Sequence, residues 1–336
     1  VKPGVLDGTM KTIRRHFCLL LFLPVFLIAE EKESKPDQSS AVDSIETILL
    51  DPVDSRRDRT VPLKVYLPAE EKPLPVVLFS HGLGGSRDGN PYLGEHWALH
   101  GYVAIFMQHI GSDRSLWEAV EPAQRMEALK GGAGLKQTID RVQDIPFVID
   151  QLETWDSDPE HPLYRRIDLE HIGLSGHSYG AVTTLAVTGR TFGNGRQYRE
   201  PRIDAFLPMS PQPGDRPSPS EAFGKVEVPI LCMTGTRDGS PIDPSLAPET
   251  RQEVYRALPP GDKYQLVFGG GEHFAFGEGG GFRAQARNPN HHPAIQALSV
   301  KFWDAYLKAD NEAKAWLQSD VPKQELLESE DTWEWK

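Results

Sequence analysis

Apolar runs of strand type alternate along this chain with stretches of helical periodicity. Two short alternating runs, in residues 45–54 and 61–68, predict a pair of antiparallel leading strands. Later on, apolar residues recur at spacings of three and four in residues 137–155 and 292–307, as in amphipathic helices. Such alternation predicts an α/β protein with one mostly parallel, doubly wound sheet and helices on both faces. Its buried strands are expected within residues 76–79, 102–107, 167–175, 203–211, 228–233 and 264–268.

The segment at residues 10–29 differs from the rest in composition. It has a basic start, an apolar core over residues 17–28 and a small Ala29 before an acidic run, which is the pattern of a secretory signal peptide. A membrane anchor is the alternative, but the apolar core is short and interrupted by a proline. We therefore expect a cleaved signal peptide, no stable membrane anchor and a secreted or periplasmic protein. Residues 30–44 are polar and aperiodic, which predicts a disordered linker.

Composition and charge narrow the possible partners. Charged residues make up 25% of the chain and hydrophobic residues 39%, as in a globular protein. The formal net charge of −12 argues against a nucleic-acid partner, because phosphate binding draws on clustered Lys and Arg. Cys18 lies in the expected signal peptide, so the mature chain would keep only Cys232 and could form no intrachain disulfide. Because the histidines and cysteines lack the spacing of zinc ligands, no metal site is expected.

A strand-to-helix corner at residues 176–180 carries the strongest chemical signal. The sequence GHSYG follows an apolar run and precedes a small-residue helical pattern, which is the context of a nucleophile elbow. Glycines at both flanks relieve the crowding of so tight a turn. Ser178 is therefore predicted to project from the carboxyl edge of the sheet, at the amino end of a helix.

A glycine-rich loop at residues 81–85 follows the buried run at 76–79. It could cradle a phosphate or form an oxyanion hole, a set of N–H donors for a developing negative charge. A phosphate-binding loop requires a Lys and a Ser or Thr at Walker spacing, and these are missing. An oxyanion hole requires only a free amide, so we favour it. We expect the amides of Leu83 and Tyr179 to be the two donors, and His81 to be a structural hydrogen-bonding residue.

Three residues of complementary chemistry each follow a predicted buried strand. Ser178, Asp238 and His273 should meet at one sheet edge, because the carboxyl ends of parallel strands lie together. A serine hydroxyl needs an imidazole as base, and the imidazole needs a carboxylate on its other nitrogen. The order serine, acid, histidine is that of the α/β-hydrolase triad. The alternatives that we considered are Asp204, Asp215 and Asp243 for the acid, and His291 and His292 for the base.

Residues 113–136 form a longer connection than is usual between a strand and a helix. We expect a small cap-like insertion here, in which Leu116, Trp117 and Met126 either contact the substrate or simply pack the insertion onto the domain. The whole of residues 45–320 is expected to form one domain. The acidic tail at residues 321–336 shows no evident core role in the sequence.

Four motifs taken together, FSHGLGG, GHSYG, GTRDGSPI and GGEHFAFG, resemble those of α/β-hydrolase serine esterases. The resemblance covers roughly residues 45–310 and is nearest to dienelactone-hydrolase-like proteins, platelet-activating factor acetylhydrolases and cutinase-like polyester hydrolases. It implies an α/β-hydrolase fold and a carboxylic ester hydrolase without a cofactor. It also implies Ser178 as nucleophile, His273 as base, Asp238 as acid, and Leu83 and Tyr179 as oxyanion donors.

Several substrates remain open at this point. We expect a small-molecule or polymer ester, with short to medium acyl esters as the first hypothesis. A phospholipid or a polyester is the second, and a peptide bond is a further alternative on the same fold. A binding module on an inactive hydrolase scaffold is disfavoured, because no member of the expected triad is missing from the sequence.

Overall fold

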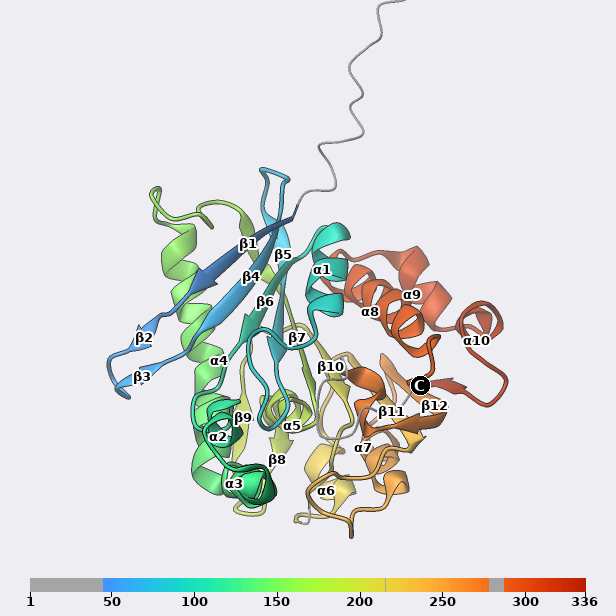
Figure 1. The fold of residues 1–336 in the computed structure, drawn as a ribbon. Coiled ribbons are helices and arrows are strands. Elements are labelled where there is room, and N and C mark those ends of the chain that lie inside the picture. The colour runs from blue at the N-terminus through green and yellow to red at the C-terminus, as the bar shows by residue number, and fades with distance from the viewer. Residues whose placement is uncertain (1–44, 215, 278–286) are drawn as a thin grey trace, which may run out of the picture. The chain divides into compact units, whose positions relative to one another are not determined.

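The computed structural model describes residues 45–214, 216–277 and 287–336. The expected signal peptide at residues 10–29 and linker at residues 30–44 lie outside the described residues. The described part of the chain forms a central sheet of nine strands with helices on both faces (Figure 1). The predicted fold class, a mostly parallel doubly wound sheet, is confirmed.

The sheet is parallel in its middle and antiparallel at its edges. In the middle, β6, β5, β7, β10, β11 and β12 pair in parallel, whereas β1, β4 and β13 run antiparallel to their neighbours. Every residue of the central strand β5 is buried, because helices cover both faces and a strand there is apolar throughout rather than alternating. The spatial order is β1 (Ile45–Leu50), β4 (Leu63–Pro68), β6 (Val103–Met107), β5 (Leu74–Ser80), β7 (Ile167–His177), β10 (Ala205–Met209), β11 (Ile230–Arg237), β12 (Lys263–Glu272) and β13 (Thr332–Trp335).

Two hydrophobic cores lie against the two faces of the sheet. One holds apolar side chains of α4 (Leu135–Asp156), α5 (Tyr179–Ala186), α6 (Pro219–Phe223) and α7 (Glu253–Ala257). The other holds those of α1 (Pro91–Leu99), α8 (His291–Leu307) and α9 (Asn311–Leu317). The helical periodicity at 137–155 and 292–307 thus corresponds to α4 and α8, which Figure 1 shows on opposite sides of the sheet.

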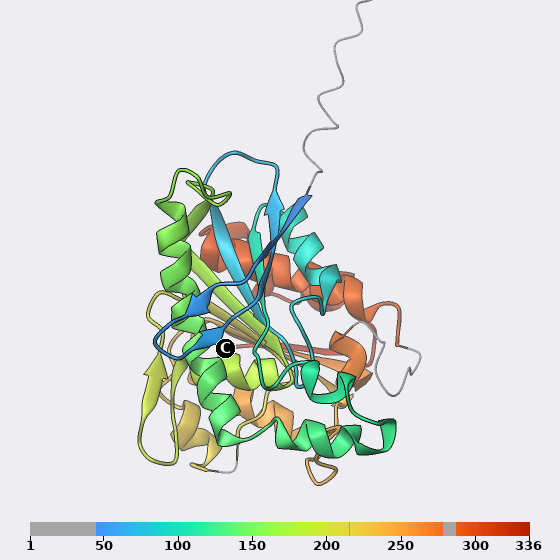
Figure 2. The ribbon, with the colours of Figure 1, turned by 60° about the vertical axis from the view of Figure 1, so that its left-hand side comes forward.

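The cap-like insertion consists of short helices. They are α2 (Ser115–Glu118), a 3₁₀ turn (Pro122–Gln124) and α3 (Arg125–Gly131), and they lead directly into α4. Figures 1 and 2 both show α2 and α3 at the end of the sheet where α5 begins. The insertion therefore lies beside the edge at which the parallel strands end.

Two short hairpins lie outside the central sheet. Residues 188–199 form a hairpin of β8 (Thr188–Thr191) and β9 (Gln197–Arg199), while β2 (Val53–Asp54) and β3 (Arg59–Thr60) form another. The Pro- and Ser-rich connection at 211–224 contains α6, whose first turn is held by a capping box between Ser218 and Glu221.

The acidic tail is part of the fold, contrary to the sequence-based expectation. After α10 (Val321–Glu325), strand β13 pairs with β12 at the edge of the sheet. Trp333 is buried there, and its indole N–H donates to the carbonyl oxygen of Leu317. The composition of this segment is acidic, but the alternation of Trp333 and Trp335 with polar residues is that of an edge strand with one covered face.

Candidate active site

Ser178 lies at the corner between β7 and α5. Its backbone has a positive φ of 58° with ψ of −115°, which is a strained conformation for a residue with a side chain. The glycines on both sides of Ser178 make this corner possible, because other backbone atoms lie too close to them to leave room for a side chain. A Cβ on Gly180 would collide with the carbonyl oxygen of Ser80, and one on Gly176 would meet the carbonyl group of Gly180. The two glycines therefore allow the turn that exposes the serine.

The side chains of Ser178, His273 and Asp238 form one hydrogen-bonded chain. The Nε2 atom of His273 lies 2.8 Å from the Oγ atom of Ser178, and its Nδ1 atom lies 2.7 Å from Oδ1 of Asp238. An ionised Asp238 can only accept, so the imidazole proton lies on Nδ1 and the lone pair on Nε2 faces the hydroxyl. The three residues follow β7, β11 and β12, so the sheet edge brings them together as the sequence predicted.

Asp238 is fully buried and accepts from several donors besides the imidazole. Thr234 Oγ1 donates to its Oδ2 at 2.8 Å, and the guanidinium of Arg251 lies 2.9 Å from its Oδ1. Burial alone would raise the pKa of Asp238, but the hydrogen bond from His273 and the charges of His273 and Arg251 outweigh it and lower the pKa below its usual value. Asp238 is thus kept ionised, as the tautomer of His273 requires.

Arg251 is a residue of this site that the sequence did not reveal. It is buried in a 3₁₀ turn (Pro248–Gln252) and donates to the backbone oxygens of Asp238 and Ser210, at 2.6 and 2.8 Å. No motif marks it, because it lies in a polar stretch after the GTRD motif. His177 was also missed; its Nε2 atom donates to the carbonyl oxygen of His273 at 3.0 Å and holds that backbone in place.

The two expected oxyanion donors belong to segments that adjoin the serine. A Cβ on Gly82 would lie 3.4 Å from the Cβ of Ser178, so the glycine-rich loop passes directly beside the nucleophile. Within the described residues, the amide of Leu83 donates no hydrogen bond. The amide of Tyr179 is in the first turn of α5, where amides have no partner within the helix.

His81 has the structural role expected of it. It is buried, and its Nε2 accepts from the backbone N–H of His109 at 3.0 Å, so its proton lies on Nδ1. That Nδ1–H donates to the carbonyl oxygen of Gly82 at 2.6 Å. This carbonyl and the amide of Leu83 belong to the same peptide group, so the hydrogen bond fixes the direction in which that amide points.

A buried network of charged residues lies beneath the glycine-rich loop and was also not predicted. Asp144 on α4 accepts from Arg57, Arg59 and His109, each at 2.8 Å. The Nε2 atom of His109 lies 2.9 Å from the Oγ atom of Ser80, at the end of β5. The network therefore joins the β2–β3 hairpin, α4 and the base of the loop.

The cap residues named from the sequence have three different environments. Trp117 donates from Nε1 to the carbonyl oxygen of Gly84 at 2.7 Å, so it packs on the glycine-rich loop. Leu116 packs within the cap, since a Cβ on Gly132 would collide with its side chain. Met126 is 42% exposed, on the outer part of the cap. Whether any of them contacts a substrate remains a prediction.

The rival residues have other partners. Asp204 accepts from the amide of Ile172, and Asp243 from the amide of Ser245. His291 stacks on Phe268 with ring centroids 4.2 Å apart, and His292 stacks on Tyr92 at 3.6 Å. The remaining candidate for the acid, Asp215, lies outside the described residues.

Comparison with known proteins points to one superfamily. Residues 55–132 match the sequence model of the family described as platelet-activating factor acetylhydrolase, isoform II. The chain is 23% identical to cutinase est2 of Thermobifida alba over 63% of this chain and 56% of that protein. It is 25% identical to cutinase 1 of Thermobifida cellulosilytica over 63% of this chain and 64% of that protein. The chain therefore spans little more than half the length of the relatives it matches.

The observed sheet topology and the serine corner after β7 are those expected from the sequence motifs. The chain has the α/β-hydrolase fold. In its described part, no helix is long and apolar enough to cross a membrane. In the same residues, no three His, Cys, Asp or Glu side chains gather as ligands for a metal ion.

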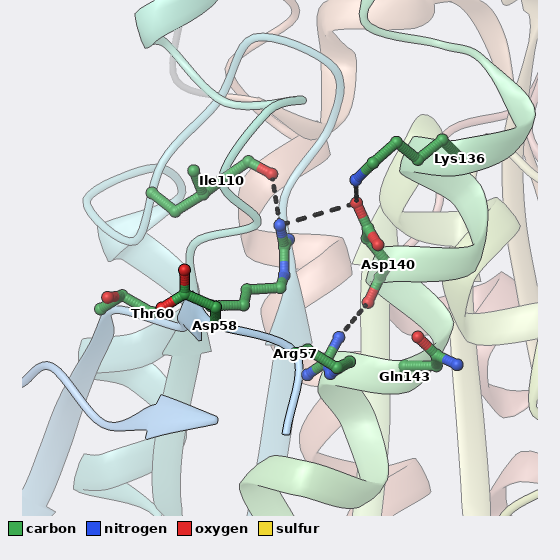
Figure 3. Close-up of a pocket in the computed structure, with 8 residues that line it drawn as sticks. Arg57, Asp58, Thr60, Ile110, Lys136, Asp140 and Gln143 are labelled. Atoms are coloured by element: carbon green, nitrogen blue, oxygen red, sulfur yellow. Dashed lines mark hydrogen bonds and ion pairs between the residues drawn. The ribbon is translucent and has the colours of Figure 1, made fainter. Parts of the chain in front are cut away.

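The described part of the chain also has a cavity of about 610 Å³ between the β2–β3 hairpin and α4 (Figure 3). Its cationic side chains are already paired: Arg59 and Lys136 with Asp140, and Arg57 with Asp144. None of the residues of the hydrogen-bonded chain at Ser178 lines it. The lining residues are Arg57, Asp58, Arg59, Thr60, Ile110, Lys136, Asp140 and Gln143.

Proposed function

We propose that this α/β-hydrolase is a serine carboxylic ester hydrolase that works through an acyl-enzyme. The observation that carries the proposal is the chain of two hydrogen bonds, 2.8 and 2.7 Å, from Ser178 through His273 to Asp238. A serine so connected to a base and an acid is equipped for acyl transfer. The likeness to cutinases and to the platelet-activating factor acetylhydrolase family supports the same class of reaction.

In the first half of the proposed reaction, the Oγ atom of Ser178 attacks the ester carbonyl carbon and its proton passes to Nε2 of His273. Asp238 stabilises the imidazolium, and the amides of Leu83 and Tyr179 receive the oxyanion. The tetrahedral intermediate then collapses, the bond to the alkoxy oxygen breaks, and the imidazolium protonates the departing alcohol. In the second half a water molecule repeats these steps on the acyl-enzyme and releases the acid.

Labelling by a fluorophosphonate tests this proposal, because only a serine activated by its base reacts. We expect wild-type protein to be labelled and to hydrolyse short-chain nitrophenyl esters. Ser178→Ala should abolish labelling and lower turnover by at least about 10⁴-fold. Ser157→Ala, at the solvent-exposed end of α4, is the matched control and should behave as wild type. Wild-type turnover by Ser178→Ala would refute the proposal.

We further propose short to medium acyl esters as substrates, since the cap contributes only short helices beside the glycine-rich loop. Polyesters or phospholipids are the second candidate, favoured by the relatives and by Phe274, which is 40% exposed next to His273. Nitrophenyl esters of increasing chain length, a phospholipid and polyester particles separate the two. A rate that rises towards long chains, or that appears only with aggregated substrate, would contradict the first candidate.

Export is part of the same proposal and rests on residues 10–29 alone. We expect the full chain, expressed with its first 44 residues, to be released from the cytoplasm and trimmed near Ala29. Mass spectrometry of the amino terminus would check this. An intact amino terminus on exported protein would favour an anchor instead.

A further inference from the structure

Arg141 is a fully buried arginine on α4, close to the proposed site. Its guanidinium donates to three side-chain oxygens: Ser80 Oγ at 3.0 Å, Ser112 Oγ at 2.8 Å and Thr183 Oγ1 at 2.9 Å. It also donates to the carbonyl oxygen of His81 through a short hydrogen bond. All three of its nitrogens are therefore committed to fixed acceptors.

Three of these four acceptors, all but Ser112, belong to the two segments that carry the proposed oxyanion donors. Ser80 immediately precedes the glycine-rich loop, and His81 is its first residue, two residues before Leu83. Thr183 lies in α5, and the guanidinium carbon lies 4.5 Å from the ring centroid of Tyr179, the first residue of that helix. One side chain thus holds the loop and the helix at a fixed separation.

The charge of Arg141 is not neutralised by contact. Among the described residues, no carboxylate lies within ion-pair distance of it; Asp144, three residues further along α4, pairs with Arg57 and Arg59 instead. A buried cation with neutral partners costs free energy in the resting protein. A negative charge that develops on the substrate nearby would interact favourably with it, more strongly than in water.

A second buried arginine, Arg190, offers a comparison, because it also has no carboxylate partner among the described residues but lies elsewhere in the fold. Arg190 is also buried, donates to the carbonyl oxygen of Pro213, and lies over the rings of Phe192 and Phe223. In the part of the chain that the structure describes, Arg190 makes no hydrogen bond to the glycine-rich loop or to the first turn of α5. The difference between the two arginines lies in which segments each one joins.

We propose that Arg141 is a positioning residue of the oxyanion hole. It sets the distance between the amides of Leu83 and Tyr179 and places a permanent positive charge behind them. The proposal rests on the proposed function, because it presupposes an oxyanion at that point. It assigns Arg141 an effect on the transition state rather than on the binding of the ground-state ester.

The test compares Arg141→Met and Arg141→Lys with Arg190→Met as the matched control. We expect Arg141→Met to lower kcat about 100-fold and to change KM less than about threefold, because displaced oxyanion donors act on the transition state. Its affinity for an alkyl boronic acid, which forms a tetrahedral adduct with the serine, should fall by the same factor. Affinity for the non-hydrolysable amide analogue of the ester should stay near the wild-type value. Arg141→Lys keeps the charge and should recover part of the loss.

Arg190→Met should keep wild-type kcat and boronate affinity, whatever its effect on thermal stability. If Arg141→Met does not fold, Thr183→Val, which is nearly isosteric and removes one acceptor, should still weaken boronate binding several-fold. Unchanged boronate affinity in the folded variants, or an equal loss for boronate and amide, would overturn the proposal. Wild-type protein without esterase activity or fluorophosphonate labelling would instead refute the proposed function, so the two failures are distinguishable.

Discussion

Asp238 shares one carboxylate oxygen between two donors. Oδ1 lies 2.7 Å from Nδ1 of His273 and 2.9 Å from Nε of Arg251. Arg251 also donates to two backbone carbonyl oxygens, that of Asp238 itself and that of Ser210 in the segment after β10. The arginine therefore orients the acid while taking up part of its negative charge, and both effects act on the imidazole that the acid supports.

Removal of Arg251 should affect both stability and turnover. Arg251→Met leaves a buried carboxylate with fewer partners and several carbonyl oxygens without a donor, so we expect the free energy of unfolding to fall by about 3–5 kcal/mol. We expect kcat to fall at least about tenfold, because Asp238 is no longer held in place. Urea unfolding and nitrophenyl ester kinetics measure the two effects. Arg256→Ala, on the exposed side of α7, serves as control, and equal behaviour of the two variants would contradict this role.

At the residue scale, the sequence predicted the members of the site that belong to motifs. Ser178 and His273 follow buried strands within glycine-rich patterns, and such patterns reflect a local constraint on the backbone. Arg141 and Arg251 act through partners that are distant along the chain, and a lone arginine in a helix or a polar loop looks like any surface cation. Only the tertiary structure shows that both are buried.

At the scale of elements, the strands of the middle of the sheet were predicted best. Strands β5, β6 and β10 are apolar along nearly their whole length, so burial on both faces can be read directly from the residues. Edge strands have one covered face and are short, and their signal is a brief alternation. For that reason β13 was not predicted: its short alternation lies in a segment whose composition is acidic.

The buried indole of Trp333 should be the main contribution of β13 to stability. We expect Trp333→Ala to lower the free energy of unfolding by about 3–5 kcal/mol, because it leaves a cavity against β12 and removes the hydrogen bond to Leu317. Thr332→Ala, at an exposed position of the same strand, should change it by less than about 0.5 kcal/mol. Chemical denaturation of both variants checks this. Wild-type stability of Trp333→Ala would show that the edge strand is dispensable.

At the scale of the whole molecule, several imidazoles are buried in their neutral form. Burial, together with the charge of Arg141, lowers the pKa of His109 to about 4 and holds the pKa of His81 well below its usual value. Burial and the neighbouring His273 lower the pKa of His177 to about 3. In the unfolded chain these rings take up protons near pH 6.5, whereas in the folded chain they do so only at lower pH. A fall in pH below about 6.5 therefore favours the unfolded state.

The stability of the folded chain should therefore be greatest above about pH 7 and should fall steadily between about pH 6.5 and pH 4. Each buried imidazole contributes up to about 1.4 kcal/mol per pH unit in this range. Asp144 and Asp238, whose pKa values are lowered in the folded state by their partners despite burial, add a further loss below about pH 4. Urea unfolding at pH 7.5, 6, 5 and 4 measures the slope. A constant free energy of unfolding from pH 7.5 to pH 5 would contradict the neutral state of these rings.

The positive φ of Ser178 bears on any effort to make this protein more heat-resistant. Glycine adopts such a backbone conformation without strain, so Ser178→Gly would remove the backbone strain at this corner, which any variant that keeps the serine retains. Selection for thermostability alone would thus reward the loss of the very hydroxyl that the proposed chemistry requires. Directed evolution of this fold needs a screen that demands turnover and heat resistance in the same clone.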